Sequence, residues 1–270
     1  MKPHSRTICL LALVFTIHYS PFTIHDLHAA PIQKPVKYKD GYNEVKIDDG
    51  SVYKGIMKDG KFNGKGIFIY PSGDVYEGDF VYGSVDGEGK YLYTTGDRYE
   101  GSFKFWHFNG KGTFTYKNGD KYTGDFKDGK SDGNGVFVSA RGDRYEGRFA
   151  NNRFNGGGLY KTADGKTYDG TFVNGRCDGQ GTMTMPDGTK YTGGFKDGKF
   201  NGHGTLINKQ GKKYVGDFKE NHFHGKGTIY YKNMNGEYKQ VEQDGYWFKD
   251  EYLGTDENKF NIKENIKKID

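Results

Sequence analysis

The chain has 270 residues, of which 43 are Gly, 22 Tyr and 20 Phe. Because Gly costs about 1 kcal/mol inside a helix whereas Tyr and Phe favour strands, this composition excludes helical bundles and doubly wound α/β folds. The net charge is only +5, from 40 Lys plus Arg and 35 Asp plus Glu. It is spread among acidic residues, which excludes the clustered basic surface of a nucleic-acid-binding protein.

Residues 1–30 have the composition of a targeting segment. Lys2 and Arg6 precede an apolar run from Ile8 to Ile17, and the segment ends in two alanines. This pattern predicts a secretory signal peptide, because the run is short for a transmembrane helix. We therefore expect a secreted or cell-envelope protein, periplasmic in a Gram-negative cell. If the signal is not cleaved, it would instead anchor the chain to the membrane.

From residue 53 on, the sequence repeats every 23 residues. Eight tyrosines, each followed two residues later by Gly, set this period: Tyr53, Tyr76, Tyr99, Tyr122, Tyr145, Tyr168, Tyr191 and Tyr214. Counted from each Tyr as offset 0, a large apolar residue stands at offset 4, glycines at offsets 11 and 13, and another Gly at offset 20 in seven repeats. The structural residues so defined include Gly78, Phe80, Gly87, Gly89, Gly101, Phe103, Gly110, Gly112, Gly124 and Phe126. Such a period is typical of stacked repeats that stabilise one another.

The repeat that begins at Tyr122 illustrates the strand pairing that these offsets predict. Asp128 and Gly129 are typical of a two-residue hairpin turn. The resulting register sets three pairs opposite each other: Phe126 and Ser131, Gly124 and Gly133, and Tyr122 and Gly135. Each repeat Tyr and Phe should thus face a glycine, whose missing Cβ leaves room for the ring to cover the backbone.

A second turn must return the chain to the same face of the sheet. Only a loop with an odd number of residues does this, and three residues that end in the offset-20 Gly fit a type I turn followed by a left-handed Gly. This turn places Tyr145 opposite Phe137 and Phe149 opposite Gly133. The predicted fold is all-β: an elongated single-layer antiparallel β-meander of about seventeen strands at roughly 4.8 Å spacing, on the order of 80 Å long. One face is aromatic and the other, which carries Glu77 among others, is polar.

Two stretches of the sequence resemble a known family. Tyr122-Thr-Gly-Asp-Phe-Lys-Asp-Gly-Lys and Asn109-Gly-Lys-Gly-Thr-Phe-Thr-Tyr are similar to MORN (membrane occupation and recognition nexus) repeats. The resemblance implies interaction rather than chemistry, because MORN arrays serve as scaffolds, dimerisation surfaces and membrane-associated modules. Relatives that carry a lipid kinase or a SET methyltransferase domain need more residues than the roughly sixteen that follow the last repeat here.

The repeat pattern also predicts the domain organisation. After the signal peptide, residues 31–52 should form a degenerate half-repeat cap and residues 53–236 the eight repeats. Residues 237–254 should form a divergent final repeat, displaced by an insertion of about six residues near Asn235. Residues 255–270 form a basic tail or a short capping helix. Its stripe of Ile262, Ile266 and Ile269 should cover the last strand, with a membrane-surface role as the alternative.

The sequence predicts no catalytic set, no metal site and no cofactor. Residues 124–131 match the phosphate-loop pattern, but that loop needs a helix after it and here the same frame recurs in other repeats as strand, turn and strand. His203, His222 and His224 stand at offsets that are mostly polar elsewhere, which favours solvated surface histidines. Cys177 takes an offset occupied by Phe in other repeats, so it is expected in the core rather than as a nucleophile.

One turn departs from the pattern and supplies the candidate contact site. Where other repeats have Lys-Asp-Gly-Lys, the third has Lys104-Phe105-Trp106-His107. Two large rings should project from this hairpin tip and could anchor an interface, unless they fold back over a neighbouring turn. We take Phe105, Trp106 and His107 as the candidate contact with a partner or a membrane.

The functional hypothesis is a non-enzymatic scaffold that binds a protein partner outside the cell or at its envelope. A homodimer through the open ends of the array is a further expectation. The alternatives are a peripheral module that binds acidic lipids and should be sensitive to salt, and a glycan-binding surface in which exposed tyrosines stack on sugar rings.

Overall fold

The structure is a computed structural model that describes residues 38–266, without the side chains of residues 240–242 and 266. The predicted signal peptide and Ile269 lie outside the described residues. The described chain forms two units that divide between Arg153 and Phe154.

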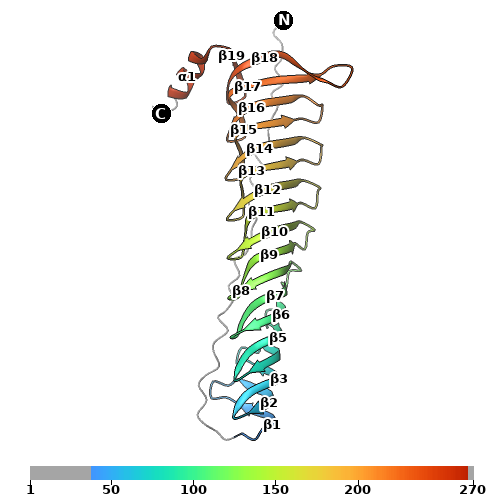
Figure 1. The fold of residues 1–270 in the computed structure, drawn as a ribbon, viewed down its shortest axis with the longest axis vertical. Helices are drawn as coiled ribbons and strands as arrows, with labels where there is room; N and C mark the ends of the chain where they lie inside the picture. Colours follow the sequence, from blue (N-terminus) through green and yellow to red (C-terminus); the bar gives the residue numbers. More distant parts are fainter. Residues whose placement is uncertain (1–37, 267–270) are drawn as a thin grey trace. The chain divides into compact units, whose positions relative to one another are not determined.

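The first unit contains ten strands (Figure 1). They are β1 (Gly41–Lys46), β2 (Val52–Lys58), β3 (Lys61–Ile69), β4 (Val75–Val81), β5 (Ser84–Leu92), β6 (Arg98–Lys104), β7 (His107–Thr115), β8 (Lys121–Lys127), β9 (Lys130–Val138) and β10 (Arg144–Ala150). Each pairs antiparallel with the next one in the chain. This is a meander, as predicted.

The second unit continues the same pattern (Figure 1). Its elements are β11 (Arg153–Lys161), β12 (Thr167–Val173), β13 (Arg176–Thr184), β14 (Lys190–Lys196), β15 (Lys199–Ile207), β16 (Lys213–Lys219), β17 (His222–Lys232), β18 (Tyr238–Phe248), β19 (Glu251–Gly254) and α1 (Glu257–Ile266). The strands again pair antiparallel in chain order. The predicted fold class, a single-layer antiparallel meander of hairpin repeats with a short C-terminal helix, is confirmed.

Both predicted turns are present. Asp128 and Gly129 have φ of 47° and 79°, as a two-residue turn with both central residues at positive φ requires. In the second turn the amide of Gly142 donates to the carbonyl of Ser139 at 2.9 Å, and Gly142 has φ 94°. The register after this turn is also confirmed, since Tyr145 pairs with Phe137 and the next pairs follow in step to Phe149 and Gly133.

Within the hairpin, the predicted register is correct only next to the turn. Phe126 pairs with Ser131, but Gly124 pairs with Gly135 and Tyr122 with Phe137, so the predictions for Gly124 and Tyr122 were wrong by two residues. The cause is a bulge in β9, where Gly133 has φ 117° and the pairing shifts between Gly124 and Phe126.

This bulge explains why each repeat begins with Tyr rather than Phe. The residue at offset 3 lies at the register shift, and its carbonyl accepts a hydrogen bond from the repeat's own Tyr hydroxyl. Tyr122 donates in this way to the carbonyl of Asp125 at 2.8 Å. All eight repeats make the bond, with acceptor carbonyls on Ile56, Asp79, Ser102, Asp125, Arg148, Thr171, Gly194 and Asp217. A buried carbonyl left without a partner would cost about 1–3 kcal/mol.

The glycines of offsets 2 and 13 form a row across the strands, and the Tyr ring covers them. A Cβ on Gly135 would lie 2.5 Å from Cε2 of Tyr122, and one on Gly124 would lie 2.6 Å from its hydroxyl oxygen. The predicted cover of glycine by aromatic rings is therefore present, although the ring reaches its glycines diagonally.

The aromatic rings form the core. Tyr99 stacks on Phe108 at 3.8 Å between ring centroids and meets Phe126 of the next repeat edge-on at 5.0 Å. These contacts recur along each unit, and seven of the eight repeat tyrosines have at most 1% of their surface exposed.

The C-terminal helix lies on the face of the sheet opposite the aromatic core, the polar face that carries Glu77, which we call the outer face. Phe260 packs on Tyr246 and His224, at 5.9 and 5.2 Å between ring centroids, and Glu264 contacts Lys219 and His224. The predicted short helix is present, but Ile262 of the predicted stripe does not cover a strand, since it is 60% exposed. The side chains of Ile266 and Ile269 lie outside the described residues. The docking residues are Phe260 and Glu264, which share a face because they are four residues apart.

Candidate functional site

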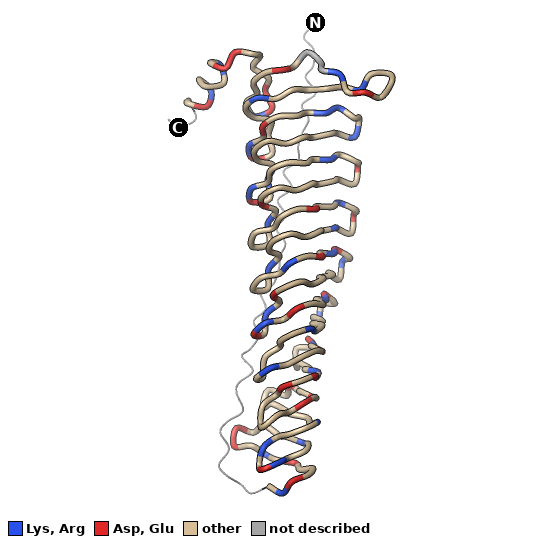
Figure 2. The backbone as a smooth tube through the Cα atoms, viewed as in Figure 1, with Lys and Arg blue, Asp and Glu red and all other residues tan. Residues whose placement is uncertain are grey.

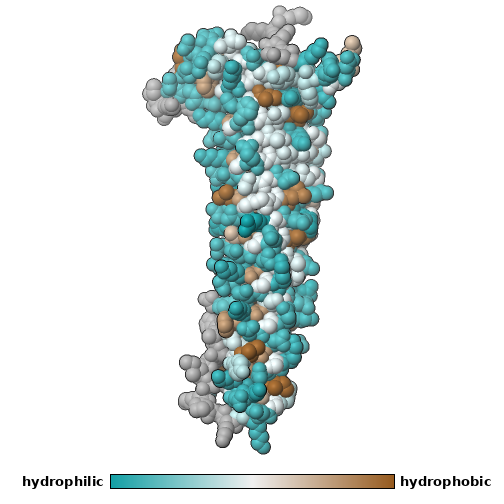
Figure 3. Space-filling model, in the orientation of Figure 1, coloured by the Kyte–Doolittle hydropathy of each residue, from teal (hydrophilic) through white to brown (hydrophobic). Residues whose placement is uncertain are grey.

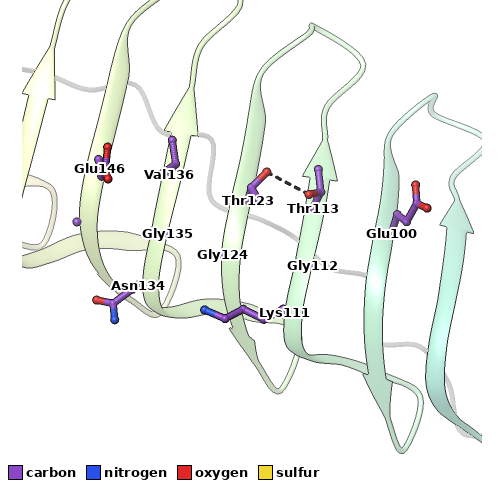
Figure 4. A pocket seen from close by; sticks show the side chains of 11 residues that line it. Glu100, Lys111, Gly112, Thr113, Thr123, Gly124, Asn134, Gly135, Val136 and Glu146 are labelled. Carbon is purple, nitrogen blue, oxygen red and sulfur yellow. Dashed lines mark hydrogen bonds between the residues drawn. The ribbon is translucent and has the colours of Figure 1, made fainter.

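The outer face of the first unit carries an open groove of about 710 Å³ that crosses β6 to β10 (Figure 4). The floor of the groove is backbone. The glycines at offsets 2 and 13 have no side chain, and a Cβ on them would point toward the tyrosine rings on the other face. The residues that line it are Glu100, Lys111, Gly112, Thr113, Thr123, Gly124, Asn134, Gly135, Val136, Glu146 and Gly147. Strand alternation explains this set, since offsets 1, 12 and 14 point away from the aromatic face.

Polar contacts fix the walls of the groove. The Thr113 and Thr123 hydroxyls hydrogen-bond at 3.1 Å (Figure 4), and Lys111 pairs with Asp125 at 2.6 Å. Burial acts to raise the pKa of Asp125, but the hydrogen bonds from Lys111 and from the amide of Asn134 outweigh it and hold the pKa below its usual value. The groove thus offers fixed charges and hydroxyls to a ligand.

The structure separates the three residues of the predicted contact site. Phe105 and Trp106 both have positive φ, 49° and 69°, which is unusual for bulky residues. Phe105 projects and is 64% exposed. Trp106 does not project. It follows the alternative of folding back, since it packs on Phe68 with 5.3 Å between ring centroids and is 6% exposed. His107 begins β7 and is half-buried.

Sequence reasoning missed the neighbouring tip. Tyr82 takes the same turn position as Phe105 one repeat earlier, with φ 47°, and is 73% exposed. The same comparison of offsets could have found it, because five of the other repeats have Asp or Asn at this position, residues that tolerate positive φ.

A second missed feature is the β17–β18 hairpin, whose strands, at 11 residues each, are the longest. Here the insertion lengthens both strands (Figure 1). A Lys–Tyr cluster lies at its end, consisting of Lys212, Lys213, Lys232, Tyr230, Tyr231 and Tyr238, with ammonium-to-ring distances of 4.9 to 5.4 Å. Met234 at the tip is fully exposed. Elsewhere Lys and Arg mix with Asp and Glu (Figure 2), and the face in Figure 3 is largely hydrophilic with scattered apolar patches.

Within the described residues, the largest pKa shifts follow burial, and the histidines considered as metal ligands contact carboxylates. Burial raises the pKa of the Cys177 thiol to about 12 and that of Tyr53 to about 12. His222 contacts Asp250 at 2.7 Å and His203 contacts Asp217 at 3.1 Å, which are single pairs. Within residues 38–266, no group of three or more His, Cys, Asp or Glu is placed to hold a metal ion. No described helix combines the length and apolar character needed to cross a membrane.

Some solved structures are similar to the chain. The TCP domain of SAS-4 (dCPAP) of Drosophila melanogaster, in complex with a proline-rich motif of Ana2 (dSTIL), is 12% identical over 80% of this chain and 99% of that one, with a TM-score of 0.30. The TCP10 domain of Danio rerio CPAP, in complex with a peptide of Danio rerio STIL, is 13% identical over 76% and 96%, with a TM-score of 0.35. Virginiamycin B lyase from Staphylococcus aureus is 13% identical over 75% and 70%, with a TM-score of 0.15. At these TM-scores the likeness carries no argument.

A comparison with curated proteins finds no match. The family model described as MORN repeat matches eight consecutive segments, residues 53–75, 76–98, 99–121, 122–144, 145–167, 168–190, 191–212 and 214–233. These segments begin at the eight repeat tyrosines whose hydroxyls close the bulges. The chain therefore belongs to the MORN repeat family.

Proposed function

We propose that the chain is a non-enzymatic scaffold that holds a protein partner in the groove across β6 to β10. The groove carries this proposal because it combines an accessible backbone floor with fixed hydroxyls and charges. Interfaces of this kind bind by many polar contacts around a few anchors, and the Phe105 ring, exposed at the turn between β6 and β7, could supply one anchor.

The test places a photo-crosslinking amino acid at Thr123 in the groove. Thr192 is the matched control, since it is exposed and makes the same hydroxyl pair, with Thr182 at 3.1 Å, in the second unit. A discrete crosslinked partner at position 123 but not at 192, identified by mass spectrometry, supports the proposal. Equal crosslinking at both positions, or none at 123, contradicts it.

We also propose that the scaffold works outside the cell or at its envelope, because residues 1–30 have the pattern of a secretory signal. The N-terminal sequence of the protein isolated from its own cells tests this. A start close to Pro31 supports cleavage and export, whereas an intact Met1 supports the anchor. A homodimer through the ends of the array is a further proposal, and sedimentation velocity across protein concentrations tests it.

A second candidate function is binding to acidic membranes, and the Lys–Tyr cluster favours it. Lysines over tyrosine rings beside an exposed Met resemble the amphipathic side chains that lie at membrane interfaces. Lys212→Glu with Lys232→Glu should abolish co-sedimentation with acidic vesicles. Lys226→Glu, an exposed site on the same β17 strand, should leave it intact. Wild-type protein that stays in the supernatant would exclude this function.

Glycan binding through the repeat tyrosines is not proposed. That hypothesis needed exposed ring faces, and these rings are buried, from 0% exposed in Tyr122 to 2% in Tyr214.

A further inference from the structure

We infer that a second pocket on the outer face binds a carboxylate of an acidic partner segment. This pocket, of about 360 Å³, is lined by Lys90, Tyr91, Leu92, Arg98, Tyr99, Glu100, Thr113, Thr115 and Lys121. It shares Glu100 and Thr113 with the groove, so a segment that lies in the groove can reach it. The inference rests on the proposed function and specifies the chemistry of the partner.

Strand register brings two cations over one hydroxyl. Arg98 pairs with Thr115 across β6 and β7, and Thr115 pairs with Lys121 across β7 and β8. The Cα atoms of Arg98 and Lys121 are therefore about 10 Å apart, two strand spacings, on the same face of the sheet. Their long side chains can converge above Thr115 on one anion, and the Arg fork matches a carboxylate in two hydrogen bonds.

The nearby carboxylates of the chain are already engaged. Glu100 pairs with Lys90 at 3.3 Å. Asp97 accepts hydrogen bonds from the Lys117 amide at 2.8 Å and the Thr95 hydroxyl at 2.8 Å, and Asp120 likewise accepts two within the turns. Among residues 38–266, no ion pair includes Arg98 or Lys121. Both cations are thus available to an external anion.

The next repeat shows the contrasting case. Arg144 stands at the same offset as Arg98 and Lys121, but its guanidinium pairs with Glu146 at 2.7 Å. Arg144 is therefore a cation at the equivalent position whose charge is already paired, although Val138 stands beside it in place of Thr115. It serves as the control for the charge at this offset. Leu92, 49% exposed at the rim of the pocket, adds an apolar contact suited to a peptide rather than to a free ion.

The experiment measures fluorescence anisotropy of a labelled peptide of four Ser-Glu pairs, titrated with the full chain. A peptide of four Ser-Gln pairs is the ligand control. We expect the glutamate peptide to bind and the glutamine peptide not to. Arg98→Gln with Lys121→Gln should weaken the affinity about tenfold, which is the combined effect expected from the loss of two exposed charge contacts. Arg144→Gln should change the affinity less than about twofold, because the charge of Arg144 is already paired.

Three outcomes would overturn the inference. These are equal binding of both peptides, an equal loss in Arg144→Gln, and a charge-dependent loss that occurs only with phosphatidylserine vesicles, which would make the pocket a lipid site. The crosslinking at Thr123 separates this inference from the proposed function. Suppose that neither the wild type nor any variant binds the glutamate peptide, while the Arg98→Gln, Lys121→Gln protein keeps its crosslinked partner. The pocket inference then fails and the scaffold proposal stands.

Discussion

Replacement of Gly135 by Ala should destabilise the array strongly, because the new methyl group would collide with a buried ring. The added Cβ would lie 2.5 Å from Cε2 of Tyr122 and 2.6 Å from its hydroxyl oxygen, distances that real side chains do not adopt. The Tyr122 ring is 0% exposed and lies against Phe126 and Phe149, with ring centroids 5.0 and 4.7 Å apart. It has no free space into which it can move.

The magnitude follows from the two contacts that the displaced ring disturbs. Overpacking a core costs about 1–3 kcal/mol. Loss of the Tyr122 hydrogen bond leaves the carbonyl of Asp125 without its donor at 2.8 Å, which costs about 1–3 kcal/mol more. We expect the free energy of unfolding to fall by about 2–6 kcal/mol.

Gly157→Ala is the matched control, because a Cβ there meets nothing within 4 Å. It should change stability by less than about 1 kcal/mol, and toward greater stability through the lower entropy of the unfolded chain. Urea unfolding followed by circular dichroism compares the two variants. Hydrogen exchange of the β8 and β9 amides shows whether the loss is local, as stacked repeats allow. Equal unfolding midpoints for the two variants would refute the reasoning.

Three further predictions concern single side chains. Tyr191→Phe removes the donor to the carbonyl of Gly194 at 2.8 Å and should lower the free energy of unfolding by about 1–3 kcal/mol; an unchanged urea midpoint would contradict this. Trp106→Gly supplies the usual turn residue but removes a buried ring, so thermal unfolding should show a net loss of about 2–4 kcal/mol, and a gain would mean that the ring does not pack. Cys177 is buried with its thiol pKa raised to about 12. It should stay protonated and unreactive toward a thiol reagent at about pH 8 until the protein unfolds, measured in a Cys9→Ser background; rapid reaction of the folded protein would contradict this.

The repeat period predicts the faces of the sheet but not the full register. Side chains alternate with a period of two, so a slip of two residues leaves every residue on the same face. The bulge in β9 shifts the pairing by that amount, from Gly133 to Gly135 opposite Gly124. Alternation therefore could not reveal the error. The signal was the extra Gly at offset 11, whose positive φ marks a bulge.

The missed contacts depend on residues far apart in sequence. Trp106 is buried because Phe68 lies beside it, and the turn sequence alone cannot show that neighbour. The helix α1 was predicted from its isoleucines, yet Phe260 docks because Tyr246 and His224 lie beneath it on the outer face. In both cases the local sequence pattern predicted the turn or the helix correctly, but it contained no information about the residues against which that element packs.

The two faces of the sheet also explain why the fold was easier to predict than the site. Offsets 0, 2, 4 and 13 repeat because the Tyr ring, its glycines and its hydrogen-bonded carbonyl permit little else, and these constraints fill the aromatic face. The outer face has no such constraint, so the offset that carries Arg98 and Lys121 carries Val75 one repeat earlier and an Arg paired with Glu146 one repeat later. A partner can be selected only by residues that the fold leaves free to vary. The scaffold function that we propose would therefore take its specificity from the departures from the repeat on the outer face, rather than from the repeat itself.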